Sequence, residues 1–497
     1  MMTITAGSDQ LTKKDTSYLD FWRVPSNYHP DLPSFKRSIE LYANDQSFQQ
    51  SYLQDPVATL AGYGLGHIQP LEIDIIVNRE LAMQYPEGGE KRIPELVHQY
   101  RQFIKAKQRH CCEIRDDVPI HPGWHQWRER MVKATLWRDG PIKHRKLVHA
   151  PFTIELTHGC TVGCWFCGVD AEKFQGPVEV SDEVLKFWRQ LLEAFKSIGG
   201  EHFSQHGFCY WATDPLDHPQ YELFLEHFHQ ILGYWPQTTT AQVLKHAPRF
   251  RQLLKTLESK NGFVQRFSMT RSTDLKAIFD FFTPEELFLC EMIPQYDDKL
   301  SPKATAGRVR KLVLKKQAKE KPISFRYDLD ATGSIACVSG FLINLVQHSI
   351  KLITPCAASD KWPLGYRILG EYQYQHAENI ETVLRLMLDH CINNRLLPDD
   401  QLRLIYGVDC SSAQDGSLSV SSHGYAFVIK EVQCAERLSE LLRSGEYTVD
   451  QICHEIEHDG GLRINTLIVL HQLFEQGVFD EDLLDSSRPP LPCVLEL

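Results

Sequence analysis

Three cysteines lie close enough together in the sequence to hold one metal centre. Cys160, Cys164 and Cys167 have a Cys-x3-Cys-x2-Cys spacing. The segment before them, 152–156, alternates apolar and polar residues and predicts a short strand, so the cysteines lie in the loop that follows it. Four thiolates would complete a tetrahedral zinc site or ligate all four irons of a cubane. Three thiolates leave one iron of a [4Fe–4S] cluster open for another ligand.

This pattern resembles the radical S-adenosylmethionine (SAM) superfamily, in which the amino and carboxylate groups of SAM bind the open iron. The superfamily favours an aromatic residue just before the third cysteine, and Phe166 fits. The resemblance implies that the three cysteines ligate the cluster and that Phe166 contributes to the cofactor site. It also implies that SAM is cleaved to methionine and a 5′-deoxyadenosyl radical. The alternatives are three chance cysteines or a zinc knuckle. A knuckle needs a fourth ligand, and the nearby His158 has an unsuitable spacing for that role.

Composition limits the class of protein. A length of 497 residues predicts two or three domains. No apolar run is long enough to span a bilayer and the N-terminus lacks a secretory pattern, so we expect a cytoplasmic protein without a membrane partner. The 14 cysteines then indicate metal or radical chemistry in a reducing compartment. A net charge of −11 argues against a nucleic-acid partner.

The order of apolar patterns predicts the domains. Residues 1–110 show helical spacing and predict a helical N-terminal region, and 111–149 predict a linker. From 150 to 365, short apolar runs alternate with amphipathic stretches, which predicts βα units around a parallel sheet. With the resemblance, the fold class is α/β, with a partial (β/α) radical-SAM barrel. Its ligands should lie at the carboxyl ends of the strands.

The C-terminal region, 366–497, has a different pattern. Around 423–483, a helix, a second helix that starts with a capping box at Thr448, a third helix and a possible wing at 477–479 predict a winged-helix-like domain. Acidic residues outnumber basic ones there, so a DNA reader is not expected. The segment resembles the precursor-recognition element that binds leader peptides by adding a strand to its wing. A plain capping domain is the alternative.

The superfamily resemblance also indicates SAM contacts. The second strand usually ends in Gly-Gly-Glu, but the literal Gly199-Gly200-Glu201 follows a predicted helix and is interpreted as a helix stop. The positional equivalent is 212–215, at the end of a strand predicted over 208–213, where Asp214 would accept hydrogen bonds from the SAM ammonium group. Ser268 and Arg271, at the end of a strand predicted over 264–269, could hold the ribose and the carboxylate, or could be surface turn residues.

Three segments together, 160–169, 210–219 and 352–366, look like the proteusin-type radical-SAM peptide epimerases. The resemblance implies an isomerase that converts L-residues of a ribosomally made precursor peptide to D-residues. Its cofactors would be a [4Fe–4S] cluster and SAM. Its partners would be the leader and core of the precursor, and an external electron donor such as flavodoxin or ferredoxin.

Epimerisation requires a second hydrogen source. A peptide Cα–H is too weak an acid for a side-chain base, so abstraction by the 5′-deoxyadenosyl radical is the feasible route, and a hydrogen atom must return to the other face. A cysteine S–H suits this role because its bond is weaker than the one formed. Cys356 follows a predicted strand, 349–354, and is expected at its carboxyl end, across the barrel mouth from SAM. Cys337 is the second candidate, and a buried structural thiol is the alternative.

Two other functions remain open from the sequence. A radical-SAM crosslinking maturase would usually carry auxiliary clusters, but the remaining cysteines are scattered and form no second Cys-x2-Cys group. The second alternative to an epimerase is a non-catalytic Fe–S protein that binds leader peptides.

Overall fold

The computed structural model describes residues 28–257, 260–296, 303–323, 334–375 and 379–486. They fall into two compact units. The first holds the described residues up to His110 together with Ala247–Gly262 and Thr273–Glu291, and the second holds the rest. Both helices and strands are present, so the prediction of a mixed α/β chain is confirmed. No helix within the described ranges has the length and apolar character needed to cross a bilayer.

The first unit is built from helices. Aromatic side chains form part of its core, where Phe35 packs edge-on against Tyr100 and Phe103 stacks on Phe288. The buried ammonium group of Lys36 donates to two backbone carbonyls, of Leu287 and Cys290. The helices are α2 (Leu32–Asn44), α3 (Gln46–Gln54), α4 (Pro56–Gly62), α5 (Pro70–Val77), α6 (Arg79–Ala82), most of α7 (Glu95–Asp116), α12 (Ala247–Leu257) and most of α13 (Ser272–Phe281).

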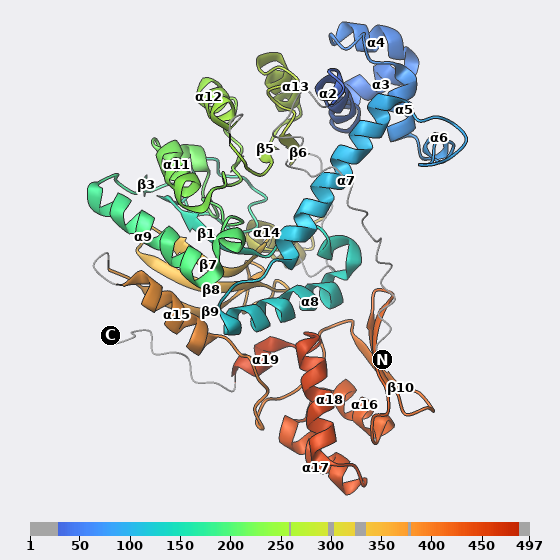
Figure 1. Ribbon diagram of the computed structural model, residues 1–497, viewed down its shortest axis with the longest axis vertical. Coiled ribbons are helices and arrows are strands. Elements are labelled where there is room, and N and C mark those ends of the chain that lie inside the picture. Colours follow the sequence, from blue (N-terminus) through green and yellow to red (C-terminus); the bar gives the residue numbers. More distant parts are fainter. Residues whose placement is uncertain (1–27, 258–259, 297–302, 324–333, 376–378, 487–497) are drawn as a thin grey trace. The chain divides into compact units, whose positions relative to one another are not determined.

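The second unit is organised around a four-stranded sheet in the order β1-β7-β8-β9 (Figure 1). Its strands are β1 (Ala150–Glu155), β7 (Val338–Asn344), β8 (Ser349–Pro355) and β9 (Tyr366–Gln373). β1 is parallel to β7, and β7, β8 and β9 form an antiparallel meander. β9 continues this sheet past residue 365, the predicted end of the barrel.

Both faces of this sheet are covered. On one face, Phe152 of β1 stacks on Phe195, and Trp124 packs edge-on against Phe341 of β7. These partners come from α8 (Pro122–His144) and α9 (Asp182–Gly199), and α10 (Glu201–Ser204), α11 (Tyr221–Leu232) and α15 (Ile380–Cys391) extend the helical layer (Figure 1). On the other face, Leu342 and Ile353 belong to an apolar cluster with Trp211.

Local sequence signals fix several of these helices. Ser181 caps α9 through its hydroxyl, and the helix ends at Gly199-Gly200, as predicted. The segment predicted as a linker, 111–149, contains the 23-residue helix α8. Trp124, Trp127 and Trp137 of α8 are fully buried, so this segment is part of the core.

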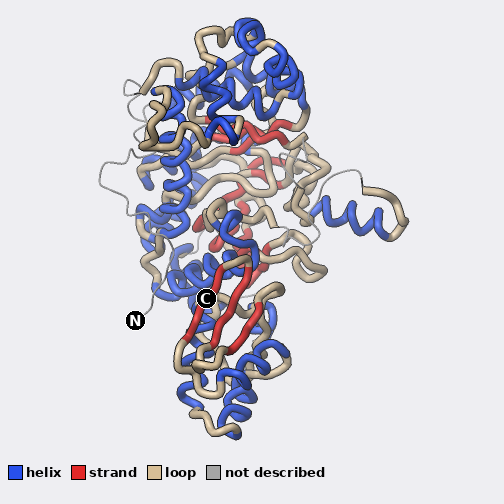
Figure 2. The backbone as a smooth tube through the Cα atoms, turned by 90° about the vertical axis from the view of Figure 1, so that its right-hand side faces the viewer, coloured by secondary structure: helices blue, strands red, loops and turns tan. Residues whose placement is uncertain are grey.

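Shorter sheets flank the central one. They are β2 (Thr157–His158) with β3 (Gly176–Pro177), and β4 (Thr239–Thr240), β5 (Gln265–Met269) and β6 (Cys290–Pro294) in that order. The strand predicted over 208–213 is wrong in extent, because only Phe208 forms a parallel bridge, with Thr153 of β1. In Figure 2, the strands of the described chain lie in separate groups, and they do not form one closed barrel. The remaining helix before β7 is α14 (Gly307–Gln317).

The C-terminal residues share one apolar core, which runs from Leu396 to Leu484 and includes Trp137 of α8. A three-stranded antiparallel sheet comes first, followed by four helices; Thr448 starts the second of them with the predicted capping box. Val478, in the segment predicted as a wing, instead accepts a hydrogen bond from the backbone of Ile405. The elements are β10 (Asp409–Ser412), β11 (Leu418–Ser422), β12 (Tyr425–Ile429), α16 (Ala435–Ser444), α17 (Val449–His458), α18 (Arg463–Glu475) and α19 (Glu481–Ser486).

Arg128 of α8 stabilises the segment that leads into β1. Its guanidinium group is buried and donates to five backbone carbonyls, those of Ile114, Arg115, Asp117, Val148 and His149. Burial lowers the pKa of Arg128 to about 10, so the side chain stays charged at neutral pH. Five carbonyls on two separate segments therefore depend on one side chain.

Replacing Arg128 with Met should keep most of the apolar volume but leave these buried carbonyls without their donor. We expect a loss of about 3–5 kcal/mol, as for the removal of one member of a buried charged network. Thermal melting followed by circular dichroism measures it. Arg385→Met is the matched control, because Arg385 is 42% exposed and pairs with Glu381 one turn away, so its loss should cost about 0.5 kcal/mol or less. Equal melting temperatures for the two variants would contradict the role of Arg128.

Candidate functional site

The loop that carries the three cysteines is held at its start by backbone contacts. The N–H of Cys160 donates to the carbonyl of Glu172 at 2.9 Å, and Cys160 forms a parallel bridge with Lys173. Gly159 has a φ of +76°, and a Cβ there would lie 2.5 Å from the carbonyl oxygen of Lys173. Only glycine allows this approach, so the turn before Cys160 is fixed by sterics.

The end of the loop is held by the start of α14. The backbone N–H of Arg308 donates to the carbonyl of Cys167 at 2.9 Å, and its guanidinium donates to the carbonyl of Cys164 at 2.7 Å. Gly307 packs so closely that a Cβ there would lie 2.5 Å from the carbonyl oxygen of Cys167. The backbone on both sides of the cysteines is thus determined by neighbouring segments.

The thiols are half-buried, and two carboxylates and the Arg308 guanidinium act on them. Burial raises the pKa of Cys160 to about 12, and Asp214 and Asp217 raise it further. Burial raises the pKa of Cys164 to about 11, and Cys167 and Asp214 add to the effect. Without a metal these two groups are therefore thiols, and metal binding would have to displace their protons.

The spacing of the thiols bears on the kind of metal centre. One zinc ion, with Zn–S bonds of about 2.3 Å, needs sulfur atoms about 4 Å apart. Within the described residues, the three loop cysteines do not form a group whose ligand atoms all lie within 4.8 Å of one another. The side chains would therefore have to move before all three could bind one zinc ion.

Asp214 lies beside the cysteine loop and is buried. Its carboxylate accepts hydrogen bonds from the hydroxyl of Thr240 at 2.8 Å and from the backbone N–H groups of Ala241 at 2.8 Å and Leu216 at 3.1 Å. Burial raises the pKa of Asp214 to about 6, although these hydrogen bonds oppose the rise. The residue is in the predicted place, but protein donors already hold its carboxylate.

Asp217 makes a direct contact with the cysteine loop that sequence reasoning missed. Its carboxylate accepts from the backbone N–H of Thr161 at 2.9 Å and from the Thr161 hydroxyl at 2.6 Å. Gln242 donates to the same carboxylate at 2.7 Å. The signal was present in the sequence, because Asp217 follows Asp214 in a short turn that Pro215 starts.

The predicted ribose and carboxylate contacts are at the end of β5. Phe267 pairs in parallel with Thr240, which donates to Asp214. Ser268 is the next residue along β5. Ser268 is half-buried, and Arg271 lies after the strand and is exposed. The structure therefore places Ser268 at the same edge of the parallel strands as Asp214.

A buried lysine lies next to Phe166. The ammonium group of Lys303 is 4.7 Å from the centre of the half-buried Phe166 ring and donates to the side chain of Gln295 at 2.9 Å. Lys303 is only 4% exposed. Sequence reasoning missed this cation because nothing in the local pattern distinguishes a buried lysine from a solvated one.

The expectation that Cys356 lies at the same strand edge as the cysteine loop is wrong. β8 runs antiparallel to β7, so Pro355 at its end is near the level of Val338, where β7 begins. The cysteine loop instead leaves the opposite end of β1, where Glu155 pairs with Asn344. The segment between β8 and β9, which starts at Cys356, still contacts a residue that packs on the cysteine loop. The carbonyl of Pro363 in this segment accepts from the N–H of Gly307 at 2.8 Å.

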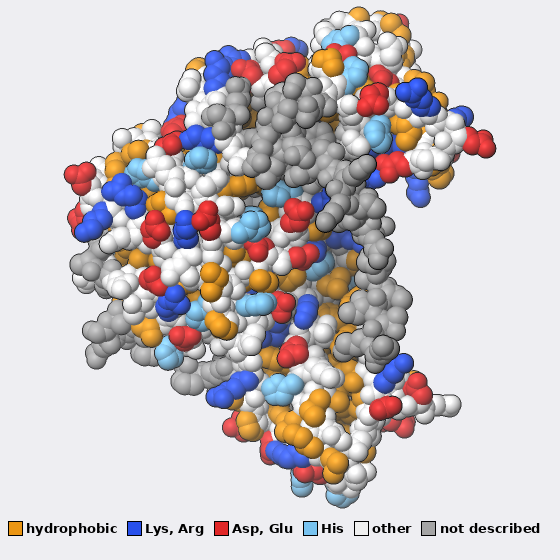
Figure 3. Space-filling view, viewed as in Figure 1, with side chains coloured by type: hydrophobic (Ala, Val, Ile, Leu, Met, Phe, Trp, Pro, Cys, Tyr) orange, Lys and Arg blue, Asp and Glu red, His pale blue; other side chains and the backbone are white. Residues whose placement is uncertain are grey.

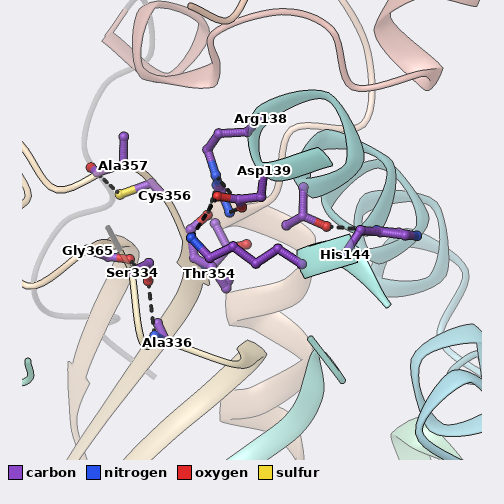
Figure 4. A network of polar contacts seen from close by, with 12 residues as sticks. Arg138, Asp139, His144, Ser334, Ala336, Thr354, Cys356, Ala357 and Gly365 are labelled. Atoms are coloured by element: carbon purple, nitrogen blue, oxygen red, sulfur yellow. Dashed lines mark hydrogen bonds and ion pairs between the residues drawn. The ribbon is translucent and has the colours of Figure 1, made fainter. Parts of the chain in front are cut away.

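Cys356 lies beside a buried ion pair (Figure 4). Its thiol donates to the carbonyl of Ala357, and burial raises its pKa to about 12. Arg138 donates to the carbonyl of Pro355 at 2.9 Å and pairs with Asp139. The neighbouring His144 has a pKa lowered by burial to about 4 and is neutral at physiological pH. The charges near Cys356 are therefore paired, and the thiol keeps its proton.

A small cavity adjoins this ion pair. Its volume is about 10 Å³, which is room for about one water molecule. Its lining residues are Thr135, Arg138, Asp139, Lys143, His144, Leu147, Ser334 and Ala336. The cavity is too small to admit a peptide.

Cys337 occupies a different environment. It directly precedes β7, and its carbonyl accepts from the N–H of Ala150 at 2.7 Å. Its side chain packs in the apolar cluster that also contains Val169 and Tyr210. Burial raises the pKa of Cys337 to about 11. The second candidate thiol thus belongs to the sheet face that the segment after Cys167 covers.

The fold and site define a mixed α/β protein with a three-cysteine loop near the carboxyl ends of parallel strands. No protein-family model matches the chain, and no solved structure matches it. Over 480 residues, it is 32% identical to a protein of Sinorhizobium fredii (strain NBRC 101917 / NGR234) named "Uncharacterized protein y4wI". The match covers 94% of this chain and 91% of that protein, so the chain belongs to the same family as y4wI.

The raised pKa of Asp214 gives a pH test on the metal-free protein. A pKa of about 6, against the ordinary value of 3.8, means that ionisation costs more in the folded state, so the stability contributed by Asp214 falls as pH rises through this window. Asp214→Asn should remove this dependence. From pH 4 to pH 7, its stability relative to wild type should rise by about 2 kcal/mol, measured by urea unfolding at each pH.

Asp360→Asn provides the control. The Asp360 side chain is 97% exposed, so its replacement should leave the pH dependence of wild type unchanged. If Asp214→Asn shows the same pH dependence as wild type, the carboxyl is not titrating in this range.

Proposed function

We propose that this protein is a radical-SAM peptide epimerase, an isomerase that converts L-residues to D-residues in a ribosomally synthesised precursor peptide. The observation that carries the proposal is the cysteine loop. Three half-buried thiols sit in a backbone fixed from both sides and lie beside the buried Asp214. The sequence resemblance to proteusin-type epimerases supplies the reaction.

The residues present fit a [4Fe–4S] cluster. Cys160, Cys164 and Cys167 would hold it, and Arg308 would fix the loop carbonyls and place a positive charge nearby. When bound, the cluster and SAM supply an electron and a hydrogen-abstracting 5′-deoxyadenosyl radical. The half-buried position of the thiols limits the access of water to such a centre.

A partial (β/α) barrel is the arrangement we propose for the strands near this loop. β1 is bridged in parallel to Phe208, and β4 is parallel to β5. Side chains join the two pairs, because the hydroxyl of Thr239 donates to that of Tyr210 at 2.7 Å. The Asp214–Thr240 hydrogen bond does the same at the carboxyl ends of the strands.

These side chains suggest how SAM is held. Asp214 would face the ammonium group, and Ser268 would face the ribose. Lys303 is a better partner for the SAM carboxylate than the exposed Arg271, because it is buried and lies over Phe166. A desolvated ammonium group binds a carboxylate more strongly than an exposed one.

The second hydrogen atom would come from Cys356. Its S–H bond breaks and a Cα–H bond forms, and an external reductant and a solvent proton restore the thiol. A hydrogen-atom donor must be a thiol and not a thiolate, and burial keeps Cys356 protonated. The segment between β8 and β9 also contacts Gly307, which packs on the cysteine loop. Cys337 is the second candidate, because it shares an apolar cluster with Val169, two residues after Cys167.

The C-terminal region would act as the winged-helix-like element that binds the leader of the precursor. Helices α16–α18 follow an antiparallel sheet in which β12 is an edge strand, and an edge can accept one further strand. Hydrophobic side chains lie at the surface over these helices (Figure 3). In the same region of the chain, the side chains of Leu462, Ile464 and Ile468 are about half exposed or more.

We further propose a cytoplasmic enzyme that receives electrons from flavodoxin or ferredoxin and binds neither nucleic acid nor membrane. On the face seen in Figure 3, acidic and basic side chains are interspersed, in keeping with a peptide partner rather than a polyanion. A crosslinking maturase would remove hydrogen from the peptide and lower its mass. An Fe–S leader-binding protein would not cleave SAM.

The cluster assignment is tested by replacing Cys160, Cys164 and Cys167 together with Ala. Anaerobically reconstituted wild-type protein should contain about four irons in this centre and release 5′-deoxyadenosine from SAM after reduction. The triple variant should do neither. SAM cleavage at the wild-type rate by the triple variant would refute the assignment.

Two glycines of the same loop give a matched pair of controls. Gly159 and Gly163 both have positive φ, but a Cβ meets the Lys173 carbonyl at position 159 and nothing within 4 Å at position 163. Gly163→Ala should therefore bind iron like wild type, apart from a conformational cost of about 1–2 kcal/mol. Gly159→Ala should lose iron because the turn before Cys160 must shift.

Deuterated water distinguishes the donor thiols. With the precursor peptide, the wild-type enzyme should place one deuterium on each inverted Cα, because the donor S–H exchanges with solvent. Cys356→Ala should still form 5′-deoxyadenosine but no D-residues, measured by mass spectrometry and chiral amino-acid analysis. Cys337→Ala should behave like wild type. The reverse result assigns the donor role to Cys337, and D-residues from both variants would exclude both thiols.

A further inference from the structure

A second cluster of metal-binding side chains lies away from the cysteine loop. Oδ2 of Asp117 is 2.7 Å from Nδ1 of His202 and 3.4 Å from Nε2 of His206. The three ligand atoms all lie within 4.8 Å of one another, the one such group of three within the described residues. We propose that Asp117, His202 and His206 bind a divalent transition-metal ion, with Zn²⁺ as the expected ion.

The backbone around this group is already in place without an ion. The N–H of Ile120 donates to the carbonyl of Gly199 at 3.2 Å, and that of His121 donates to Ile198 at 2.9 Å. These bonds join the segment after Asp117 to the segment before His202. An ion would therefore need only small side-chain movements to collect its ligands.

The orientation of Asp117 is also fixed by groups that are not ligands. Its Oδ1 accepts from the backbone N–H of Val118 at 2.9 Å, and its carbonyl accepts from the buried guanidinium of Arg128. This leaves Oδ2 directed at the two imidazoles. Supporting hydrogen bonds that orient a ligand raise the affinity of metal sites.

The chemistry of the donors selects the ion. His202 and His206 have the i, i+4 spacing that places two imidazoles on one side of a helical turn, and a carboxylate from another element is the third donor. Two imidazoles and a carboxylate suit zinc at bond lengths of about 2.0–2.2 Å. The side chain of His206 is 4% exposed and that of His202 is 75% exposed, so solvent reaches the site and can complete the coordination.

The ion would connect two segments that are 85 residues apart in sequence. Because it binds only the folded arrangement, it adds stability in proportion to the logarithm of its free concentration. This site contains no sulfur and is independent of the proposed iron–sulfur centre. The alternative is that the three side chains form a hydrogen-bonded group alone.

The test is a zinc titration of the full chain, followed by calorimetry and thermal melting. Wild type should bind zinc at a site that His202→Ala lacks or binds roughly tenfold or more weakly. Zinc should raise the melting temperature of wild type more than that of the variant. His202 is the residue of choice because its exposure makes misfolding of the variant improbable, and His206→Ala repeats the test at the buried ligand.

His458→Ala is the matched control, because the His458 side chain is 84% exposed and also lies next to an aspartate, Asp459. It should bind zinc like wild type. The absorption spectrum of bound Co²⁺ identifies the ligands, because thiolate ligation gives a charge-transfer band. The part of the cobalt spectrum that disappears in His202→Ala should not include this band. Equal zinc affinity in wild type and His202→Ala, or loss of a thiolate band in that variant, would overturn the proposal.

Discussion

The buried carboxylate of Glu155 is the interaction on which the candidate site depends. One oxygen accepts from the backbone N–H of Ala212 at 2.6 Å, and the other accepts from the side chain of Asn344 at 2.9 Å. Burial raises the pKa of Glu155, and these two donors oppose the rise. The carboxylate thereby brings together the end of β1, the end of β7 and the segment that leads to Asp214. The hydrogen bond from Thr153 to the carbonyl of Tyr210 and the contact of Asp217 with Thr161 join the same segments.

Patterns with local physical causes could be predicted from the sequence. The cap at Ser181, the capping box at Thr448 and the strands that became β1, β5 and β8 follow from neighbours in the chain. The mixed α/β class follows from their alternation. The position of Asp214 next to the loop also follows, because a segment parallel to β1 must end on the same side of the sheet.

Features that depend on long-range pairing could not be predicted. An apolar run such as Ser349–Pro355 has no intrinsic direction, and nothing local indicates how it pairs with the strand before it, Val338–Asn344. With both strands known, the four-residue connection between them excludes a parallel crossover and places Cys356 at the other edge. The ladder expected over 208–213 is replaced by side-chain bonds from Thr153 and Glu155, and no local pattern encodes these.

The mixed direction of the central sheet also determines the order in which it can form. β7, β8 and β9 are joined by connections of four residues (345–348) and ten residues (356–365), so their pairing costs little chain entropy and can occur early. β1 can bridge to Phe208 first, but it must close a loop of 189 residues, the separation of Glu155 from Asn344, before it pairs with β7. We therefore expect β1 to join a meander that already exists. During synthesis, Cys164 leaves the ribosome 144 residues before Arg308, so the contacts that hold the end of the cysteine loop form only after α14 has been made.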